Sequence, residues 1–260
     1  MTTKLSGTKA IWDRIDPIYR RVLEHPFLTG VRDGTLDHAA FGRYIVQDTL
    51  YLREYARSLA LCAARGADSS IVEMFCAHSA SAIATERLMH ASLMNRMGID
   101  PESLDGATAS PTCFAYTSFT KQACAMGERH EAIASVLPCY WIYREVGHEL
   151  MASGSPDPAY QVWIDTYADP VFNEAVEGAL AACDAVAGDL GPAATEAMVA
   201  AAQAAARYAW LFWDSAYRAD RCPQLACAAR RGVTPGPARA PPPPDAAARP
   251  PQPPPLPPLP

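Results

Sequence analysis

A carboxylate within an otherwise apolar helical pattern is the first residue in this chain that could do chemistry. Burying a carboxylate is costly unless a partner pairs with it or donates a hydrogen bond to it. Asp48 is therefore either a structural residue satisfied by a neighbouring Tyr, Trp or backbone group, or an acceptor presented to a ligand. Its face is defined by residues 41–61, where large apolar side chains recur at helical spacing at Phe41, Tyr44, Ile45, Tyr51, Leu52, Tyr55 and Leu59.

A cysteine beside a proline is the second possible reactive group. Cys139 follows Pro138 in the segment LPCYWIYREVGHE, and Tyr143 lies one turn further along the same face of the expected helix. A proline removes one helical hydrogen bond and bends the helix, and such breaks occur often at functional sites. Cys139 is a candidate nucleophile, although a buried cysteine is more commonly inert packing.

The elements that position these two residues are predicted to be helices throughout. No stretch alternates with a period of two between turn signals, so no sheet is predicted. The result is an all-α domain. Periodicity, caps and breakers predict a first helix at about 9–24 and a second that runs from a cap at Thr35 or Asp37 to Gly66. A third is predicted at about 71–97, after a cap at Ser69 or Ser70. The remaining helices are predicted at about 112–126, 131–151, 159–167, 171–187 and 193–217.

Two features near the N-terminus are expected to interrupt helical structure. Pro17 lies inside the first segment and is expected to kink it or to divide it in two. The dipeptide His25-Pro26 is expected to end that segment, and Asp33-Gly34 marks a turn before the next helix.

Composition excludes several classes of partner. Half of the 260 residues are apolar, which is enough for one large core or two small ones. A net charge of -6 gives no electrostatic footprint for nucleic acid or an anionic membrane. The first residues contain no apolar run of the signal-peptide kind, and no apolar stretch approaches the roughly 20 residues that span a bilayer. A cytoplasmic protein is predicted.

The eight cysteines are expected to be free thiols. Six of them lie at wide, irregular spacing in helical or apolar contexts. Only Cys222 and Cys227 are close together, and no His or Cys pair stands opposite them as a zinc knuckle requires. Neither a disulfide framework nor a cysteine metal site is predicted.

The composition changes abruptly toward the C-terminus. More than half of the 24 prolines follow Thr234, mostly among Ala and Arg. We expect a helical domain at residues 8–220 and a disordered, proline-rich tail at 221–260 with polyproline II character. The sequence PPPLPPLP could dock on an aromatic groove of the SH3 type. A passive tail, or a gene end read in a shifted GC-rich frame, is the favoured interpretation, because composition alone is weak evidence of a partner.

Five motifs in order along the chain resemble the TenA/thiaminase II family: DGTL at 33–36, YIVQDTLYL at 44–52, LPCYWIYREVG at 137–147, WIDTYADPVF at 163–172 and FWDSAY at 212–217. The resemblance covers residues 11–217. It implies a haem-oxygenase-like helical bundle without haem or another cofactor, usually assembled as a homotetramer. It also implies a hydrolase of aminopyrimidines in thiamin metabolism. The typical substrate is 4-amino-5-aminomethyl-2-methylpyrimidine, converted to its hydroxymethyl form, with thiamin as a slower substrate.

The same resemblance implies roles for individual residues. Asp48 matches the carboxylate that hydrogen-bonds the pyrimidine amino group and the adjacent ring nitrogen. Cys139 matches the nucleophile that attacks the pyrimidine ring to form a covalent adduct. Phe212 matches an aromatic wall against the ring. The tyrosines that line the pocket and bond to Asp, Cys or ligand are matched by Tyr51, Tyr116, Tyr143 and Tyr167.

One position departs from the family pattern. The family usually has a glutamate, the proposed acid/base, three residues before the phenylalanine matched by Phe212, and here that residue is Ala209. Asp214 lies about 200° further round the helix than Phe212 and cannot replace it. Glu86 could reach in from another helix. A non-catalytic pyrimidine- or thiamin-binding protein is therefore the alternative function.

A di-metal oxygenase is another use of this fold, and the chain holds some of the residues it would need. The last histidine is His148, so the final helices supply no histidine ligand. Glu86 and His90, four residues apart, are interpreted as a surface or structural pair. No metal is predicted. The candidate ligands considered are Glu86, His90, Glu145, His148 and Glu149.

Overall fold

The computed structural model describes residues 6–98, 104 and 106–220, and for residues 85–92 it describes the backbone alone. In this part of the chain all regular structure is helical, which confirms the all-α prediction. The helices are α1 (Gly7–Leu23), α2 (Pro26–Asp33), α3 (His38–Ala64), α4 (Ser69–Arg96), α5 (Pro111–Met126), α6 (Arg129–Met151), α7 (Pro158–Ala168), α8 (Pro170–Ala187) and α9 (Pro192–Arg218).

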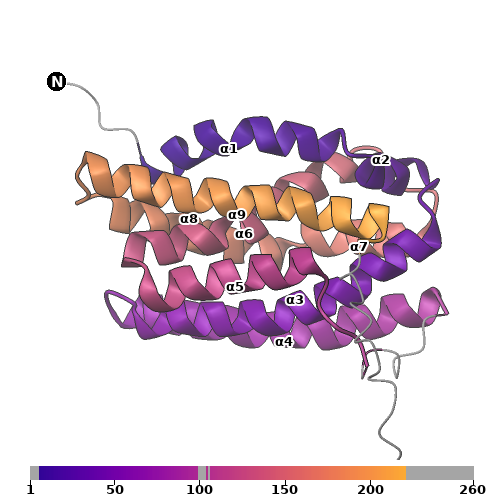
Figure 1. Cartoon of the computed structure of the whole chain (residues 1–260), viewed down its shortest axis with the longest axis horizontal. Helices are drawn as coiled ribbons and strands as arrows, with labels where there is room; N and C mark the ends of the chain where they lie inside the picture. Colours follow the sequence, from indigo (N-terminus) through magenta and orange to yellow (C-terminus); the bar gives the residue numbers. More distant parts are fainter. Residues whose placement is uncertain (1–5, 99–103, 105, 221–260) are drawn as a thin grey trace, which may run out of the picture. The chain divides into compact units, whose positions relative to one another are not determined.

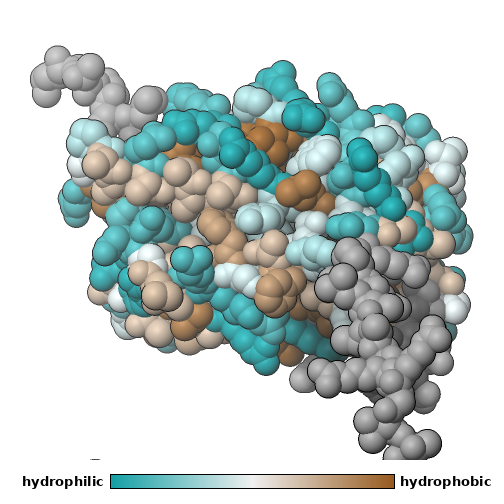
Figure 2. Space-filling model, viewed as in Figure 1, coloured by the Kyte–Doolittle hydropathy of each residue, from teal (hydrophilic) through white to brown (hydrophobic). Residues whose placement is uncertain are grey.

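The helices form a bundle in which α6 is central. Helix α6 packs against α5, α7, α8 and α9, while α3 pairs with α4 along one side and α1 pairs with α9 on the other (Figure 1). The face in Figure 2 shows a pale brown band along α9, where alanine is frequent. Small side chains let α9 lie close to its neighbours, and the buried ones include Ala202, Ala205, Ala206 and Ala209.

Helix α1 ends just before His25-Pro26 and the chain turns at Gly34, as predicted, but the segment between them forms helix α2, which was not predicted. Pro26 occupies the first position of α2, where its missing N–H would have had no helical partner anyway. The His25 side chain accepts a hydrogen bond from the Phe27 N–H at 3.1 Å and caps the helix. Gly34 ends it at φ 68°, a left-handed conformation that favours glycine.

Helix α1 is a single element, so of the two outcomes predicted for Pro17, a kink or a division of the helix, the division does not occur. Pro17 and Asp13, whose carbonyl loses its helical partner, are both exposed. Water can satisfy that carbonyl, which keeps the cost of the proline low enough for the helix to continue.

Helix α3 carries the apolar face that the periodicity predicted. Asp37 caps it by accepting from the Ala39 N–H at 3.2 Å, which confirms one of the two expected caps. Helix α4 is capped by Asp68 rather than by Ser69 or Ser70, and its carboxylate accepts from the Ile71 N–H at 3.0 Å. The large side chains of the α3 stripe are buried, with Leu52 half-buried.

Helices α7 and α8 begin in the same way, at an Asp-Pro dipeptide. Asp157 and Asp169 cap them by accepting the backbone N–H two residues later, each at 2.8 Å, while the proline takes the first helical position. This shared start holds Asp169 at the corner between α7 and α8, where it borders the cavity described below.

A close approach between α6 and α7 gives a stability prediction. A Cβ on Gly147 would lie 2.7 Å from the Tyr167 Cβ and 2.8 Å from its carbonyl carbon. We expect Gly147→Ala to cost about 1–3 kcal/mol and to lower Tm by several degrees, because backbone must move. Gly188→Ala is the control, since a Cβ there meets nothing closer than 3.4 Å. Equal melting temperatures for the two variants would contradict this packing argument.

The proline-rich tail lies outside the described residues, as do Cys222 and Cys227. The cysteines within the described part are free thiols, as predicted. Among the described residues, no helix combines the length and the apolar character that a membrane crossing requires.

Candidate active site

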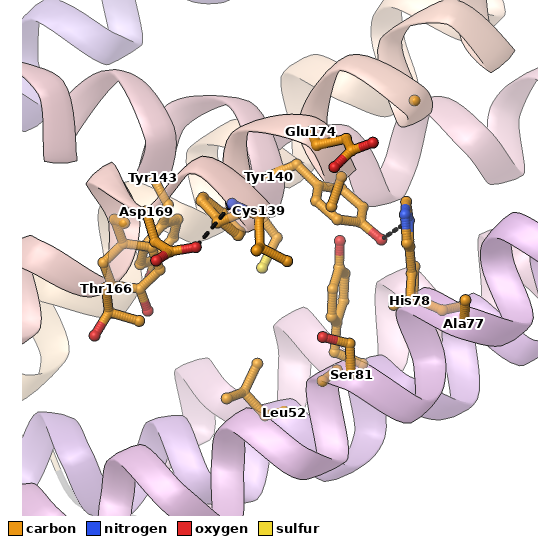
Figure 3. Close-up of a pocket in the computed structure, with 18 of the residues that line it drawn as sticks. Leu52, Ala77, His78, Ser81, Cys139, Tyr140, Tyr143, Thr166, Asp169 and Glu174 are labelled. Atoms are coloured by element: carbon orange, nitrogen blue, oxygen red, sulfur yellow. Dashed lines mark hydrogen bonds between the residues drawn. The ribbon is translucent and has the colours of Figure 1, made fainter.

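A cavity of about 930 Å³ opens between α3, α4, α6, α7 and α8, within the size range usual for small-molecule sites. Figure 3 shows side chains from several of these helices pointing into it, with the Cys139 sulfur turned toward the open centre. Its walls are largely apolar and aromatic. The aromatic residues lining it are Tyr55, Tyr140, Tyr143, Tyr167 and Phe172.

The two candidate reactive residues identified in the sequence, Asp48 and Cys139, lie at this one cavity. Asp48 from α3 and Cys139 from α6 both line it, as do the predicted site residues Tyr143 and Tyr167. Asp48 is 3% exposed. These four residues come from three different helices, so the cavity depends on how α3, α6 and α7 pack.

The other three predicted site residues are not among the residues that line this cavity, although Tyr51 lies close enough to Cys139 to influence its thiol. Tyr51 packs on Tyr116 and Phe212, with ring centroids 4.8 Å and 5.5 Å apart. Phe212 is 2% exposed and also meets Tyr44 edge-on at 5.7 Å. The hydroxyls of Tyr44, Tyr51 and Tyr116 are buried without a hydrogen-bond partner among the described residues.

The Cys139 thiol is held in its neutral form. Burial raises the pKa of the thiol to about 12, the charge of Asp48 acts in the same direction, and the nearby hydroxyls of Tyr51 and Tyr55 act against it. At neutral pH the sulfur therefore carries its proton until a reaction removes it.

The tyrosines around Asp48 are hydrogen-bond donors at any ordinary pH. Burial is the largest cause that raises the pKa values of Tyr44, Tyr143 and Tyr167 well above 10, and the Asp48 carboxylate raises them further. A protonated phenol can donate to a carboxylate, a thiolate or a ligand.

The structure adds site residues that sequence reasoning missed, among them His78, Tyr140 and Tyr55. His78 Nδ1 lies 3.1 Å from the Tyr140 hydroxyl, and both side chains line the cavity (Figure 3). The Tyr55 hydroxyl donates to the Val136 carbonyl at 2.9 Å, two residues before Pro138. The signal for Tyr55 was present, because seven residues after Asp48 is two turns along the same face. Nothing in the sequence pointed to His78.

The residues of the di-metal hypothesis do not assemble in the described part. No group of three or more described His, Cys, Asp or Glu residues has an arrangement that could hold a metal ion. The Glu145 carboxylate accepts from Arg144, with Nη2 at 2.8 Å, and His148 and Glu149 are exposed. The side chains of Glu86 and His90 lie outside the described residues.

The sequence profile of the TENA/THI-4/PQQC family matches residues 12–219 of the 260-residue chain. The chain belongs to this family. An aminopyrimidine aminohydrolase from Halalkalibacterium halodurans is 31% identical over 215 residues, which cover 82% of this chain and 96% of that protein. This result confirms the family resemblance found in the sequence motifs.

Solved structures show that this member of the TENA/THI-4/PQQC family has the expected fold. A TenA homologue from P. horikoshii superimposes with a TM-score of 0.76 at 20% identity, covering 82% of this chain and 99% of that one. A domain from Shewanella denitrificans with a haem-oxygenase-like fold gives a TM-score of 0.66 at 15% identity, covering 84% and 94%. The predicted haem-oxygenase-like bundle is confirmed.

The family resemblance places a pocket acid at the position of Ala209, but Ala209 does not line the cavity. It is fully buried in α9, and neither it nor Phe212 is among the residues that line the cavity. Asp214 is occupied elsewhere, with Oδ1 3.2 Å from His25 Nε2 and 2.8 Å from Arg218 Nε. Within the described part of the chain, helix α9 therefore contributes no carboxylate to the walls of the cavity.

Proposed function

We propose that this protein hydrolyses aminopyrimidines, with 4-amino-5-aminomethyl-2-methylpyrimidine converted to its hydroxymethyl form and thiamin as a slower substrate. The observation that carries the proposal is that Asp48 and Cys139 line one aromatic cavity in a member of this family. The name of the relative from H. halodurans supports the same reaction.

Binding of a pyrimidine follows from the chemistry of the walls. A flat heterocycle gains from aromatic faces, which Tyr143, Tyr167 and Phe172 offer. Its amino group and ring nitrogen need a fixed polar partner, and Asp48 supplies a carboxylate in the same wall. Because that carboxylate is almost fully buried, the interaction is little screened by water.

The proposed reaction balances without a cofactor. Adding the Cys139 thiol across a ring C=N bond places sulfur on carbon and the thiol proton on nitrogen. The C–N bond of the aminomethyl group then breaks and ammonia leaves. Water adds to the exocyclic carbon, the S–C bond breaks, and the thiol regains its proton. The net change is amine plus water to alcohol plus ammonia.

Binding without efficient turnover is the second candidate function. Two observations favour it: the family glutamate is replaced by Ala209, and burial raises the pKa of the Cys139 thiol to about 12. A thiol that holds its proton this firmly attacks slowly unless the substrate accepts the proton as the bond forms.

A hydrolysis assay separates the two functions. The aminomethylpyrimidine and thiamin are supplied side by side, and ammonia and thiazole release are followed together with the melting temperature of the protein. We expect turnover of both compounds, faster for the aminomethylpyrimidine. A rise in melting temperature without turnover of either compound would favour the binding function.

We also propose a homotetramer, as the resemblance implies. The sequence itself leads us to propose a cytoplasmic location and a tail, residues 221–260, that contributes nothing to folding. Light scattering on the purified protein tests the assembly. Ending the chain near Arg231 should leave Tm and activity unchanged, because proline-rich segments bury little surface. A clear fall in stability or in assembly on truncation would give the tail a docking role.

A further inference from the structure

The mouth of the cavity is acidic. Asp165, Asp169 and Glu174 line the cavity and are exposed, and Figure 3 shows Asp169 and Glu174 on its α7–α8 side. Asp48 adds a fourth carboxylate in the wall. None of the described residues that line the cavity is a lysine or an arginine. Burial lowers the pKa of His78, which keeps that imidazole neutral at neutral pH.

Within the described part of the chain, the carboxylates at the mouth are not neutralised by neighbouring cations. Asp165 accepts a hydrogen bond from Gln161 Nε2 at 2.7 Å, and Asp169 accepts from the Val171 N–H at 2.8 Å. Both donors are neutral. Within the described residues, Asp165, Asp169 and Glu174 form no ion pair.

The N-terminus of α8 opposes this charge but does not cancel it. A helix N-terminus acts as roughly half a positive charge, and α8 begins at Pro170 beside the mouth. Asp169 caps that end and Glu174 follows one turn later, so two full negative charges accompany it. The local balance remains negative.

We propose that this acidic mouth selects ligands by charge, favouring a pyrimidine with a protonated aminomethyl group over neutral analogues and rejecting phosphorylated pyrimidines. The inference rests on the proposed function, which supplies the pyrimidine. A primary amine is an ammonium ion at neutral pH. Hydrolysis replaces it with a neutral hydroxymethyl group, so the mouth holds the substrate more tightly than the product.

Three ligands that differ mainly in charge test the selection. They are the aminomethyl, hydroxymethyl and phosphorylated hydroxymethyl derivatives of 4-amino-2-methylpyrimidine, titrated calorimetrically into the full chain at low and high salt. At low salt we expect each step from cation to neutral to anion to weaken binding by about tenfold. High salt should reduce these differences because the mouth is exposed to solvent.

A charge-matched pair of variants assigns the effect to the mouth. The triple change Asp165→Asn, Asp169→Asn and Glu174→Gln should bring the three affinities to within about threefold, while asparagine still caps α8. The control removes three exposed carboxylates that do not line the cavity, by Glu24→Gln, Glu149→Gln and Asp189→Asn. The control should keep the full order of affinities.

The outcomes separate this inference from the proposed function. Equal affinities for the three ligands, or an order of affinities that survives the triple change, would overturn charge selection while leaving a pyrimidine site. If none of the three ligands binds, the proposed function falls and the inference falls with it.

Discussion

Replacing Cys139 with serine should lower kcat for aminopyrimidine hydrolysis by about a thousandfold or more, with ligand affinity nearly unchanged. The sulfur faces the cavity, where the proposed S–C bond would form (Figure 3). A serine hydroxyl is a much weaker nucleophile in a site that lines up no base for it, and losing the nucleophile removes the covalent route altogether. Single-turnover kinetics with calorimetry on the same sample measures both effects.

Cys113 provides a matched control for that experiment. Burial raises the pKa of its thiol to about 12 as well, but Cys113 does not line the cavity. Cys113→Ser should therefore keep normal turnover. If Cys139→Ser also turned over at the parent rate, the reaction would not pass through a Cys139 adduct, and Cys139 would be packing.

Changing Asp48 to asparagine should weaken pyrimidine binding by roughly 10- to 100-fold while the fold survives. The substitution keeps the side-chain shape but turns one acceptor oxygen into a donor, which leaves part of the ligand's polar edge unpaired. An unsatisfied buried group of this kind typically costs about 1–3 kcal/mol. Calorimetric titration with the hydroxymethylpyrimidine measures the loss, and thermal unfolding checks the fold.

Glu54→Gln is the control on the same helix. Glu54 lies on α3 six residues beyond Asp48, and its carboxylate pairs with Arg57 and Lys121 away from the cavity. That variant should bind pyrimidine as the parent does. An Asp48→Asn protein that binds as tightly as the parent would show that Asp48 is a structural residue, which is the first of the two interpretations the sequence allowed.

The Cys139→Ser and Asp48→Asn variants test different parts of the proposed function, the chemical step and the binding of the ligand. Loss of turnover with intact binding in Cys139→Ser, and loss of binding in Asp48→Asn, would assign chemistry to α6 and recognition to α3. If the parent protein binds but does not turn over, only the second effect remains measurable, and the replacement of the family glutamate by Ala209 becomes the leading explanation.

The sequence by itself determined the helices, because their signals are local. Periodicity identified the face of α3 with Asp48 on it, and proline, glycine and capping residues marked most helix ends to within a few residues. It missed α2, because Pro26 was interpreted only as the end of the first helix, although proline is equally suited to the first position of a new helix.

Only the tertiary structure decided which side chains meet. Asp48 and Cys139 are 91 positions apart in sequence, and no local rule predicts that α3 and α6 would face one cavity. The same packing brought Tyr51 into contact with Tyr116 and Phe212. It also brought in His78 from α4 and gathered the acidic mouth from α7 and α8, because contacts between helices depend on packing rather than on spacing along one chain segment.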